Sequence, residues 1–154
     1  MTPDVNVLVA ASRSDHPHHA IALSWLEKAL ADASGGSLLV LQPMVIASFL
    51  RLVTHPRIFA HPTPLAHALH FIDALLDAPG VQQATLGSEW HRLRQLCMDH
   101  ALSANAIPDA WLAAAAIQQG EAVVSFDSDL KRLLPRGKFT HLTPSTNTPE
   151  PSIR

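Results

Sequence analysis

The sequence predicts an α/β fold in which helices cover both faces of a central, mainly parallel sheet of about five short strands. Short apolar runs alternate along the chain with longer segments whose apolar residues recur at helical spacing. The composition can fill a core, because 47% of the 154 residues are apolar and 16% are charged, which argues against a disordered chain. We therefore expect a three-layer α/β/α domain over residues 1–143, followed by a loose, proline-containing tail over residues 144–154.

Strand and helix signals alternate in the first half of the chain. The predicted elements are a short strand running into a helix over residues 4–11, a helix over 16–33, a buried strand over 37–41 and a helix over 44–53. In the second of these, Ile21, Trp25 and Ala29 recur at spacing four, which is typical of a helix with one apolar face. Pro43 favours a helix start, since proline is pre-organised for the first helical position.

The second half continues the alternation. The predicted elements are a helix from Pro64 with an apolar stripe over residues 65–76, an edge strand over 81–86, a helix capped by Ser88, a helix over 108–119, a strand over 122–126, a short helix from Asp127 and a strand over 139–142. The helix over 108–119 is rich in alanine and apolar all round, which indicates burial. Trp25, Trp90 and Trp111 each lie on a predicted apolar face, so we expect them in the core.

Several protein classes are excluded or disfavoured. The longest apolar stretches, near residues 113–117 and 38–41, fall far short of the roughly 20 residues that cross a bilayer. Cys97 is the only cysteine, so no internal disulfide and no multi-cysteine metal site can form. The first residues do not combine a basic segment with an apolar run, as a secretory signal would. We expect a cytoplasmic protein without a membrane segment.

Aspartates fall where the predicted strands and helices meet. Asp4 lies at the first strand, Asp109 at the start of the alanine-rich helix, and Asp127 and Asp129 directly after the strand over 122–126. Because a parallel sheet gathers its ligand site at the carboxyl ends of the strands, we expect these carboxylates in one crevice. Their crowding would be costly without a divalent cation, and hard oxygen ligands favour Mg²⁺ or Mn²⁺.

Each of these aspartates also has an ordinary structural interpretation. Asp109 could simply start a helix, Asp127 and Asp129 could form a turn with an N-cap, and Asp4 could be a strand-end turn residue. The coincidence of all of them at one predicted sheet edge favours the functional interpretation.

The net charge of −2 gives no hint of a nucleic-acid partner by itself. With the four aspartates set aside, nine of the 13 acidic residues remain against 11 basic ones. Four of those bases lie close together in the sequence: Lys131, Arg132, Arg136 and Lys138. That grouping is compatible with holding a polyanion beside a metal site, and also with a plain solvated helix end.

Four segments, in order and at fitting spacing, resemble the motifs of the PIN-domain nucleases. They are Asp4-Val-Asn-Val-Leu-Val, the Phe-Leu-Arg segment over residues 49–59, Pro108-Asp-Ala-Trp-Leu over residues 108–117, and Val-Val-Ser-Phe-Asp-Ser-Asp-Leu over 123–130. Within that family the chain is most similar to the VapC-type toxins of bacterial toxin–antitoxin pairs. The resemblance covers about residues 2–143.

The resemblance implies a divalent-metal-dependent endoribonuclease that hydrolyses RNA with a metal-activated water. It implies four catalytic acids, the first three of them metal ligands: Asp4, Asp109, Asp127 and Asp129. Asn6 and Ser125 would support them through hydrogen bonds to the ligands or to metal-bound water.

The resemblance also implies partners. RNA would be the substrate, a VapB-type antitoxin would insert a peptide into the acidic crevice, and the toxin would form a homodimer. Candidate contacts with substrate or antitoxin are Arg51, Arg57, Lys131 and Arg132. The apolar stripe over residues 65–76 is a candidate contact surface, although it equally fits a core-facing stripe.

Two residues depart from the family pattern. Ser48 stands where many PIN domains carry a glutamate, which puts a second tightly held metal ion in doubt. Pro3 lies within the expected first strand, and because proline cannot donate to a strand ladder we expect that strand to be short or frayed.

Alternative functions remain open at this point. They are a housekeeping PIN nuclease in RNA processing, a catalytically silent PIN-fold binding module, for which Ser48 is the best argument, and a phosphotransferase with Asp4 as nucleophile. The last is weakened because Asn6 stands where such enzymes have a second aspartate. His16, His18 and His19 resemble a metal tract, but solvated or capping histidines are the simpler interpretation.

Overall fold

The computed structural model describes residues 1–143, so the predicted tail lies outside the described residues. The elements in chain order are β1 (Thr2–Pro3), α1 (Val5–Ser12), α2 (His19–Ser34), β2 (Leu39–Leu41), α3 (Pro43–Val53), α4 (Leu65–Leu76), β3 (Val81–Gln83), α5 (Trp90–Asp99), α6 (Ala106–Gln119), β4 (Val123–Ser125), the 3₁₀ helix η1 (Ser128–Leu133) and β5 (Phe139–His141). The α/β class is confirmed.

Every strand pair in residues 1–143 is parallel, as predicted. The strands form two hydrogen-bonded sheets, one ordered β1-β4-β5 and the other pairing β2 with β3. Thr2 is in register with Val123, and Val123 with Phe139. The carboxyl ends of β1 and β4 therefore lie next to each other, and Asp4 and Phe126 follow them directly.

Pro3 decides how β1 joins its neighbours. The two N–H groups that flank it bond to β4: Thr2 donates to the Ala122 carbonyl at 2.7 Å and Asp4 to the Val124 carbonyl at 2.8 Å. The nitrogen of Pro3 therefore faces the other way, where it has no hydrogen to give. The prediction of a short first strand is confirmed, and the strand is buried rather than frayed.

Between β1 and β2, a side-chain hydrogen bond replaces one bond of the backbone ladder. Val40 N–H donates to the Met1 carbonyl at 2.9 Å, but Pro3 cannot return a bond to Val40. The Thr2 hydroxyl donates to the Val40 carbonyl instead. The five strands thus lie side by side while the backbone ladder between β1 and β2 is incomplete.

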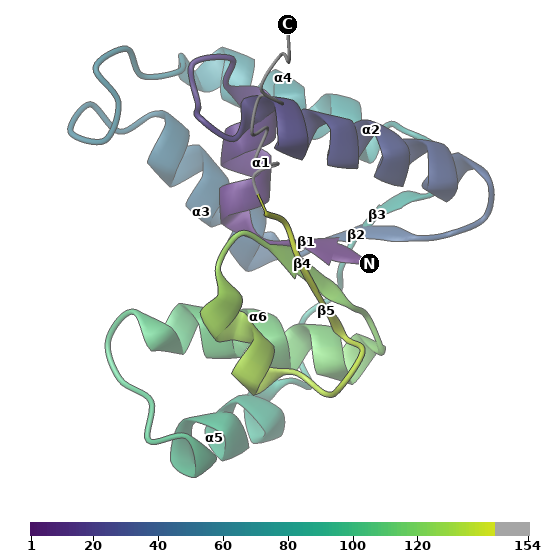
Figure 1. Cartoon of the computed structure of the whole chain (residues 1–154), viewed down its shortest axis with the longest axis vertical. Coiled ribbons are helices and arrows are strands. Elements are labelled where there is room, and N and C mark those ends of the chain that lie inside the picture. The colour runs from purple at the N-terminus through teal and green to yellow at the C-terminus, as the bar shows by residue number, and fades with distance from the viewer. Residues whose placement is uncertain (144–154) are drawn as a thin grey trace, which may run out of the picture.

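Helices cover the strands from two sides, which confirms the three-layer arrangement. Figure 1 shows α1, α2, α3 and α4 on one side of the strands, and α5, α6 and η1 on the other. The first layer is joined by contacts of α1 with α2 and α3 and of α3 with α4, and the second by contacts of α6 with α5 and η1. Asp4 begins α1 in the first layer, and Asp109 lies in the first turn of α6 in the second.

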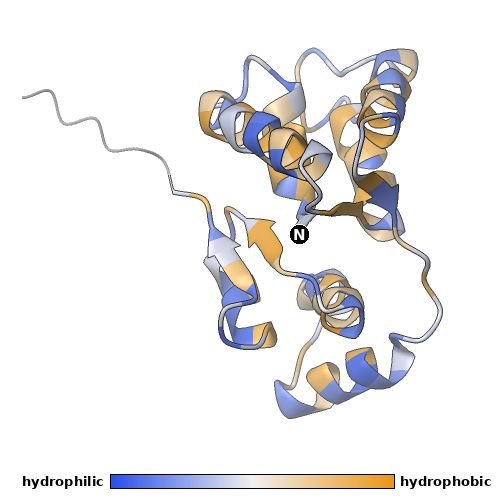
Figure 2. Cartoon of the chain, turned by 90° about the vertical axis from the view of Figure 1, so that its right-hand side faces the viewer, coloured by the Kyte–Doolittle hydropathy of each residue, from blue (hydrophilic) through white to orange (hydrophobic). Residues whose placement is uncertain are grey.

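The core runs from α1 through the strands into α6. The middle of α1, from Val7 to Ala11, is buried, and so is the stretch from Leu112 to Ala116 in α6. The predicted burial of the alanine-rich helix is confirmed, and Gly120, with φ of 70°, ends it in the left-handed conformation that favours glycine. By contrast α5, at the bottom of both views, is mostly hydrophilic (Figure 2) and buries only Leu96.

Some predicted boundaries were wrong for local reasons. The first strand precedes Asp4 instead of lying within residues 4–11, because Asp4 already caps α1. The N-cap of α5 is Glu89 and not Ser88. A carboxylate oxygen of Glu89 accepts a hydrogen bond from Gly87 N–H at 2.8 Å, in the turn that precedes the helix.

The tryptophan prediction was wrong in two of three cases. Trp25 is half-buried against the core, whereas Trp90 is 62% exposed and Trp111 is 37% exposed. The stripe of α4 buries Ala68, Ile72 and Leu75 and leaves leucines of the same helix exposed. No helix within residues 1–143 is long and apolar enough to cross a membrane.

Candidate functional site

Asp4 is a buried carboxylate fixed at the junction of β1 and α1. Its backbone is extended, and its Oδ1 accepts a hydrogen bond from Val5 N–H at 2.6 Å, so it serves as the N-cap of α1. The residue is only 6% exposed. Burial raises the pKa of the Asp4 carboxyl above its usual value, although hydrogen bonds from Ser125 and Val5 oppose the shift.

A compact hydrogen-bond network orients Asp4. The Ser125 hydroxyl donates to Asp4 Oδ2 at 2.7 Å, and Asn6 Nδ2 donates to the same oxygen at 2.9 Å. Asn6 Nδ2 also lies 2.9 Å from Ser125 Oγ, which in addition accepts from Asp127 N–H at 2.9 Å. The two residues expected to support the acids thus contact Asp4 directly, and Ser125 links it to the start of the Asp127 turn.

Asp109 lies in the first turn of α6, half-buried beside the same crevice. Its pKa is raised to about 6, first by burial and then by repulsion from Asp4, Asp127 and Asp129, with Arg132 opposing the shift. Four acids from three distant parts of the chain are therefore within electrostatic reach of one another.

Asp127 and Asp129 form the exposed rim of this acidic cluster. Asp127 follows β4 and is the N-cap of η1, where its Oδ1 accepts a hydrogen bond from Asp129 N–H at 2.8 Å. The ordinary interpretation as a turn with an N-cap therefore holds for Asp127, and its position beside Asp109 is compatible with a second role. Both side chains can turn toward the crevice because they face solvent.

The acidic cluster fits a divalent cation in its chemistry. Carboxylate oxygens are the ligands that Mg²⁺ and Mn²⁺ prefer. Burial is the first cause of the raised pKa of Asp109 and repulsion from the other acids the second, and a divalent cation would offset both. Within residues 1–143, however, no three acidic, histidine or cysteine side chains stand close enough to hold an ion as they are.

A pocket of about 410 Å³ opens beside Asp4 and Asp109. Ser48, on α3, also lines it, so the position that departs from the family pattern does lie near the acids. The rest of the lining is mainly apolar and comes from α3, α6, Val5 of α1 and Leu86. The acidic cluster therefore has an apolar, partly aromatic neighbour.

The four basic candidates are not equivalent. All are exposed: Arg51, Arg57, Lys131 and Arg132. Lys131 and Arg132 belong to η1, two and three residues after Asp129, and Arg132 is near enough to affect the pKa of Asp109. Arg51 is in the last turn of α3 and Arg57 in the loop that follows, and in the described part of the chain no contact ties either one to the acids.

The three histidines near α2 each have another contact. The His18 ring stacks on Phe126 with centroids 4.8 Å apart, His19 Nδ1 lies 2.9 Å from the Ala10 carbonyl, and His16 Nδ1 accepts from His18 N–H at 3.1 Å. This arrangement agrees with the simpler interpretation rather than with a metal tract.

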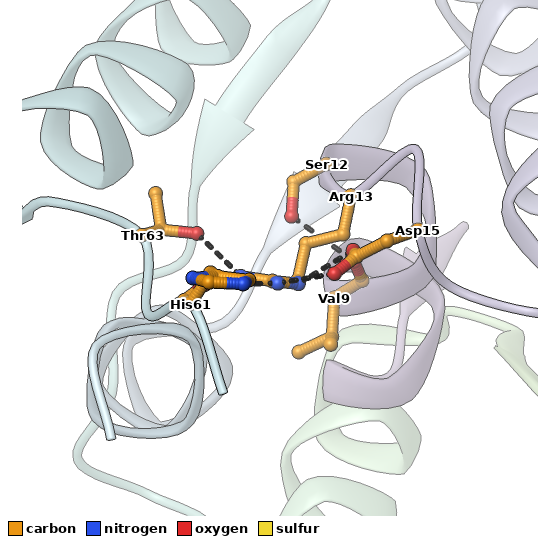
Figure 3. Close-up of polar contacts among 6 residues, drawn as sticks. All are labelled: Val9, Ser12, Arg13, Asp15, His61 and Thr63. Atoms are coloured by element: carbon orange, nitrogen blue, oxygen red, sulfur yellow. Dashed lines mark hydrogen bonds and ion pairs between the residues drawn. The ribbon is translucent and has the colours of Figure 1, made fainter. Parts of the chain in front are cut away.

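Arg13 is a buried charged residue that the sequence analysis missed. Its guanidinium holds Asp15 through two bonds of 2.6 and 3.0 Å and donates to Thr63 Oγ1 at 2.9 Å and the His61 carbonyl at 3.1 Å (Figure 3). It also lies 3.8 Å from the centroid of the Phe59 ring. Arg13 therefore links the loop between α3 and α4 to the end of α1. In the sequence, only the Arg-x-Asp spacing of Arg13 and Asp15 could have indicated this ion pair.

The comparisons with known proteins agree with this geometry. The sequence model of the PIN domain matches residues 1–133. The chain belongs to the PIN domain family. This PIN domain is 40% identical over 136 residues to Ribonuclease VapC25 of Mycobacterium tuberculosis and 41% identical over 130 residues to Ribonuclease VapC31 of the same species, with 84% of this chain and 89% of each relative covered. It is therefore of the VapC type.

Solved structures support the fold. VapBC2 of Rickettsia felis, bound to a DNA fragment from its promoter, has a chain that matches with a TM-score of 0.65 at 15% identity. The match covers 92% of the chain described here and 98% of the R. felis chain. VapC20 of M. tuberculosis, a toxin that cleaves the sarcin–ricin loop, matches with a TM-score of 0.60 at 16% identity, covering 85% and 92%.

Proposed function

We propose that this PIN domain is a divalent-metal-dependent endoribonuclease and the toxin of a toxin–antitoxin pair. The convergence of Asp4, Asp109, Asp127 and Asp129 supports it most directly, since three distant parts of the chain contribute acids to one place, where burial first and the other acids second raise the pKa of Asp109. The relatives named as VapC ribonucleases point to the same activity.

In this proposal Asp4, Asp109 and Asp127 hold Mg²⁺ or Mn²⁺, and Asp129 serves as an additional acid. The bound ion would lower the pKa of a water and neutralise charge on the scissile phosphate. Asn6 and Ser125 keep Oδ2 of Asp4 in a fixed position.

The cations of η1 give the RNA backbone a place to bind. Lys131 and Arg132 are exposed and follow Asp129 by two and three residues on the same 3₁₀ helix. They would therefore attract phosphates toward the acidic cluster rather than to a remote surface. We assign them to the substrate, and leave Arg51 and Arg57, which no described contact links to the acids, as candidates for the antitoxin.

The decisive experiment compares metal-dependent cleavage of a structured RNA by the wild type, Asp4→Asn and Asp109→Asn. Both variants should lose at least ~100-fold in rate, as expected when a ligand of the catalytic metal is removed. Asp73→Asn, an exposed acid on α4, is the matched control and should keep full activity. Retained activity in both site variants would defeat the proposal and favour a silent binding module.

The toxin role has its own test. The structural relatives that contain VapBC proteins support a VapB-type antitoxin as partner, and we propose a cytoplasmic homodimer as the active form. Expression should arrest growth, and co-expression of the neighbouring gene product should restore it. A nuclease with a housekeeping role would cleave RNA in the first assay and give no arrest in this one.

A further inference from the structure

Trp111 is a large aromatic side chain that the core does not use. It follows Asp109 by two residues on α6, is 37% exposed, and lines the pocket of about 410 Å³ together with Asp4 and Asp109. Tryptophan usually supplies apolar area to a core or an interface. A half-exposed indole beside an acidic cluster is therefore a candidate for contact with a ligand.

A hydrogen bond at the edge of the Trp111 indole holds the ring in place. Its Nε1–H donates to Glu89 Oε1 at 3.2 Å, and Glu89 Oε2 in turn accepts from Gly87 N–H at 2.8 Å. Glu89 is the N-cap residue of α5, so two helices fix the position of the ring. The bond from Nε1–H lies at the edge of the indole, so Glu89 does not cover the π-faces of the ring. A ring that is fixed in advance loses little entropy on binding.

The remaining walls of the pocket define what fits next to the indole. Pro43 and Met44 line it from α3, Leu112 from α6, and Leu86 from the loop before α5. The volume falls within the roughly 300–1,000 Å³ typical of small-ligand sites. Apolar and aromatic walls suit a flat uncharged group, while the carboxylates at one end would exclude a bare anion.

The group that meets both conditions is a nucleobase attached to a phosphate at the acidic cluster. Aromatic stacking is how proteins hold bases that have left a helix, and it works for any base. We infer that Trp111 stacks on an unpaired nucleobase next to the scissile phosphate, so that the substrate class is RNA with a single-stranded or splayed base at the cleavage position. This inference rests on the proposed function.

The test measures binding without cleavage. All proteins carry Asp109→Asn, which prevents cleavage, and Mg²⁺ is present so that the remaining carboxylates do not repel the phosphates. The probes are a short labelled oligoadenylate and an abasic ribose-phosphate strand of the same length. The affinities are compared for Trp111→Ala, Trp111→Phe and Trp90→Ala, where Trp90 is an exposed tryptophan that does not line the pocket. Intrinsic tryptophan emission is followed in the same titrations.

The expected result is specific to the base. Trp111→Ala should weaken oligoadenylate binding about 5- to 150-fold, the loss of one base–aromatic stack, and leave binding of the abasic strand unchanged. Trp111→Phe should restore most of the affinity, Trp90→Ala should bind like the parent, and RNA should quench emission only when Trp111 is present.

Other results overturn the inference. Equal losses for the two strands, unchanged affinity in Trp111→Ala, or emission that no RNA alters would each do so, and the last is expected if only a protein segment fills the pocket. The cleavage assay tests the proposed function separately. That function fails if the wild type cleaves RNA without a metal ion or does not cleave it at all.

Discussion

The Ser125 hydroxyl donates a hydrogen bond of 2.7 Å to Oδ2 of Asp4, across 121 positions of the sequence. It joins the ends of β1 and β4, which are neighbours in the parallel sheet. The same oxygen of Ser125 accepts the N–H of Asp127. One small hydroxyl therefore sets the geometry between two of the proposed metal ligands.

Ser125→Ala should impair both metal use and folding. The change removes a bond that lowers the pKa of Asp4, so that pKa should rise further and the Mg²⁺ needed for half-maximal cleavage should increase about 10- to 100-fold. The unsatisfied neighbours should cost about 1–3 kcal/mol of stability. Ser128→Ala, at an exposed position of η1, is the control. A stability loss with an unchanged Mg²⁺ requirement would show that Ser125 is only structural.

Asp109→Asn should stabilise the metal-free protein at neutral pH while abolishing cleavage. The folded-state pKa of about 6 lies above the usual 3.8, so the folded protein binds this proton more tightly than the unfolded chain does. The favourable contribution is present below the usual pKa and is lost as pH rises through about 6. Because Asp109 is half-exposed, solvent screening reduces the effect to on the order of 1 kcal/mol, or about 2–4 °C in Tm at about pH 7.

Thermal unfolding over a pH series checks this prediction. The gain for Asp109→Asn should vanish at about pH 4, where the wild-type carboxyl is protonated when folded. Mg²⁺ should raise the Tm of the wild type more than that of the variant. A lower Tm than wild type at neutral pH would contradict the electrostatic account.

Arg13→Ala should loosen the loop between α3 and α4. The substitution removes the paired bonds to Asp15 and the bonds to Thr63 and the His61 carbonyl, and we expect a loss of about 2–3 kcal/mol in the free energy of unfolding. Arg13→Lys should recover only part of it, since an ammonium lacks the planar fork.

Chemical denaturation and limited proteolysis within residues 54–64 measure the effect of Arg13. Arg57→Ala, at an exposed position in the same loop, serves as the control and should change neither. Faster cleavage elsewhere in the chain, with this loop unaffected, would refute the fastening role.

Thr2→Val should weaken the junction between the two sheets. Valine matches the shape of threonine but cannot donate to the Val40 carbonyl, and Thr2 is fully buried, so water cannot take its place. We expect a loss of about 1–3 kcal/mol in urea unfolding, with Thr2→Ser close to wild type. Thr140→Val, exposed on β5, should have little effect. Equal stability of Thr2→Val and Thr2→Ser would mean that the hydroxyl bond contributes nothing.

Local sequence determined most of the architecture of this protein. Pro43 and Gly120 mark a helix start and a helix end through their own backbone preferences, and the alternation of apolar runs with helical periods predicted the parallel α/β layers. Asp127 was placed after its strand for the same reason. These features depend on residues that are neighbours in the chain.

Only the tertiary structure decided how those pieces act together. The raised pKa of Asp109 depends first on its burial and then on acids that are more than a hundred positions away or lie beyond the end of its helix. The network of Asp4, Asn6 and Ser125 exists only because β1 pairs with β4. The exposure of Trp111 likewise depends on how α6 meets its neighbours. Burial and Coulomb interactions follow distance in space, which no local pattern encodes.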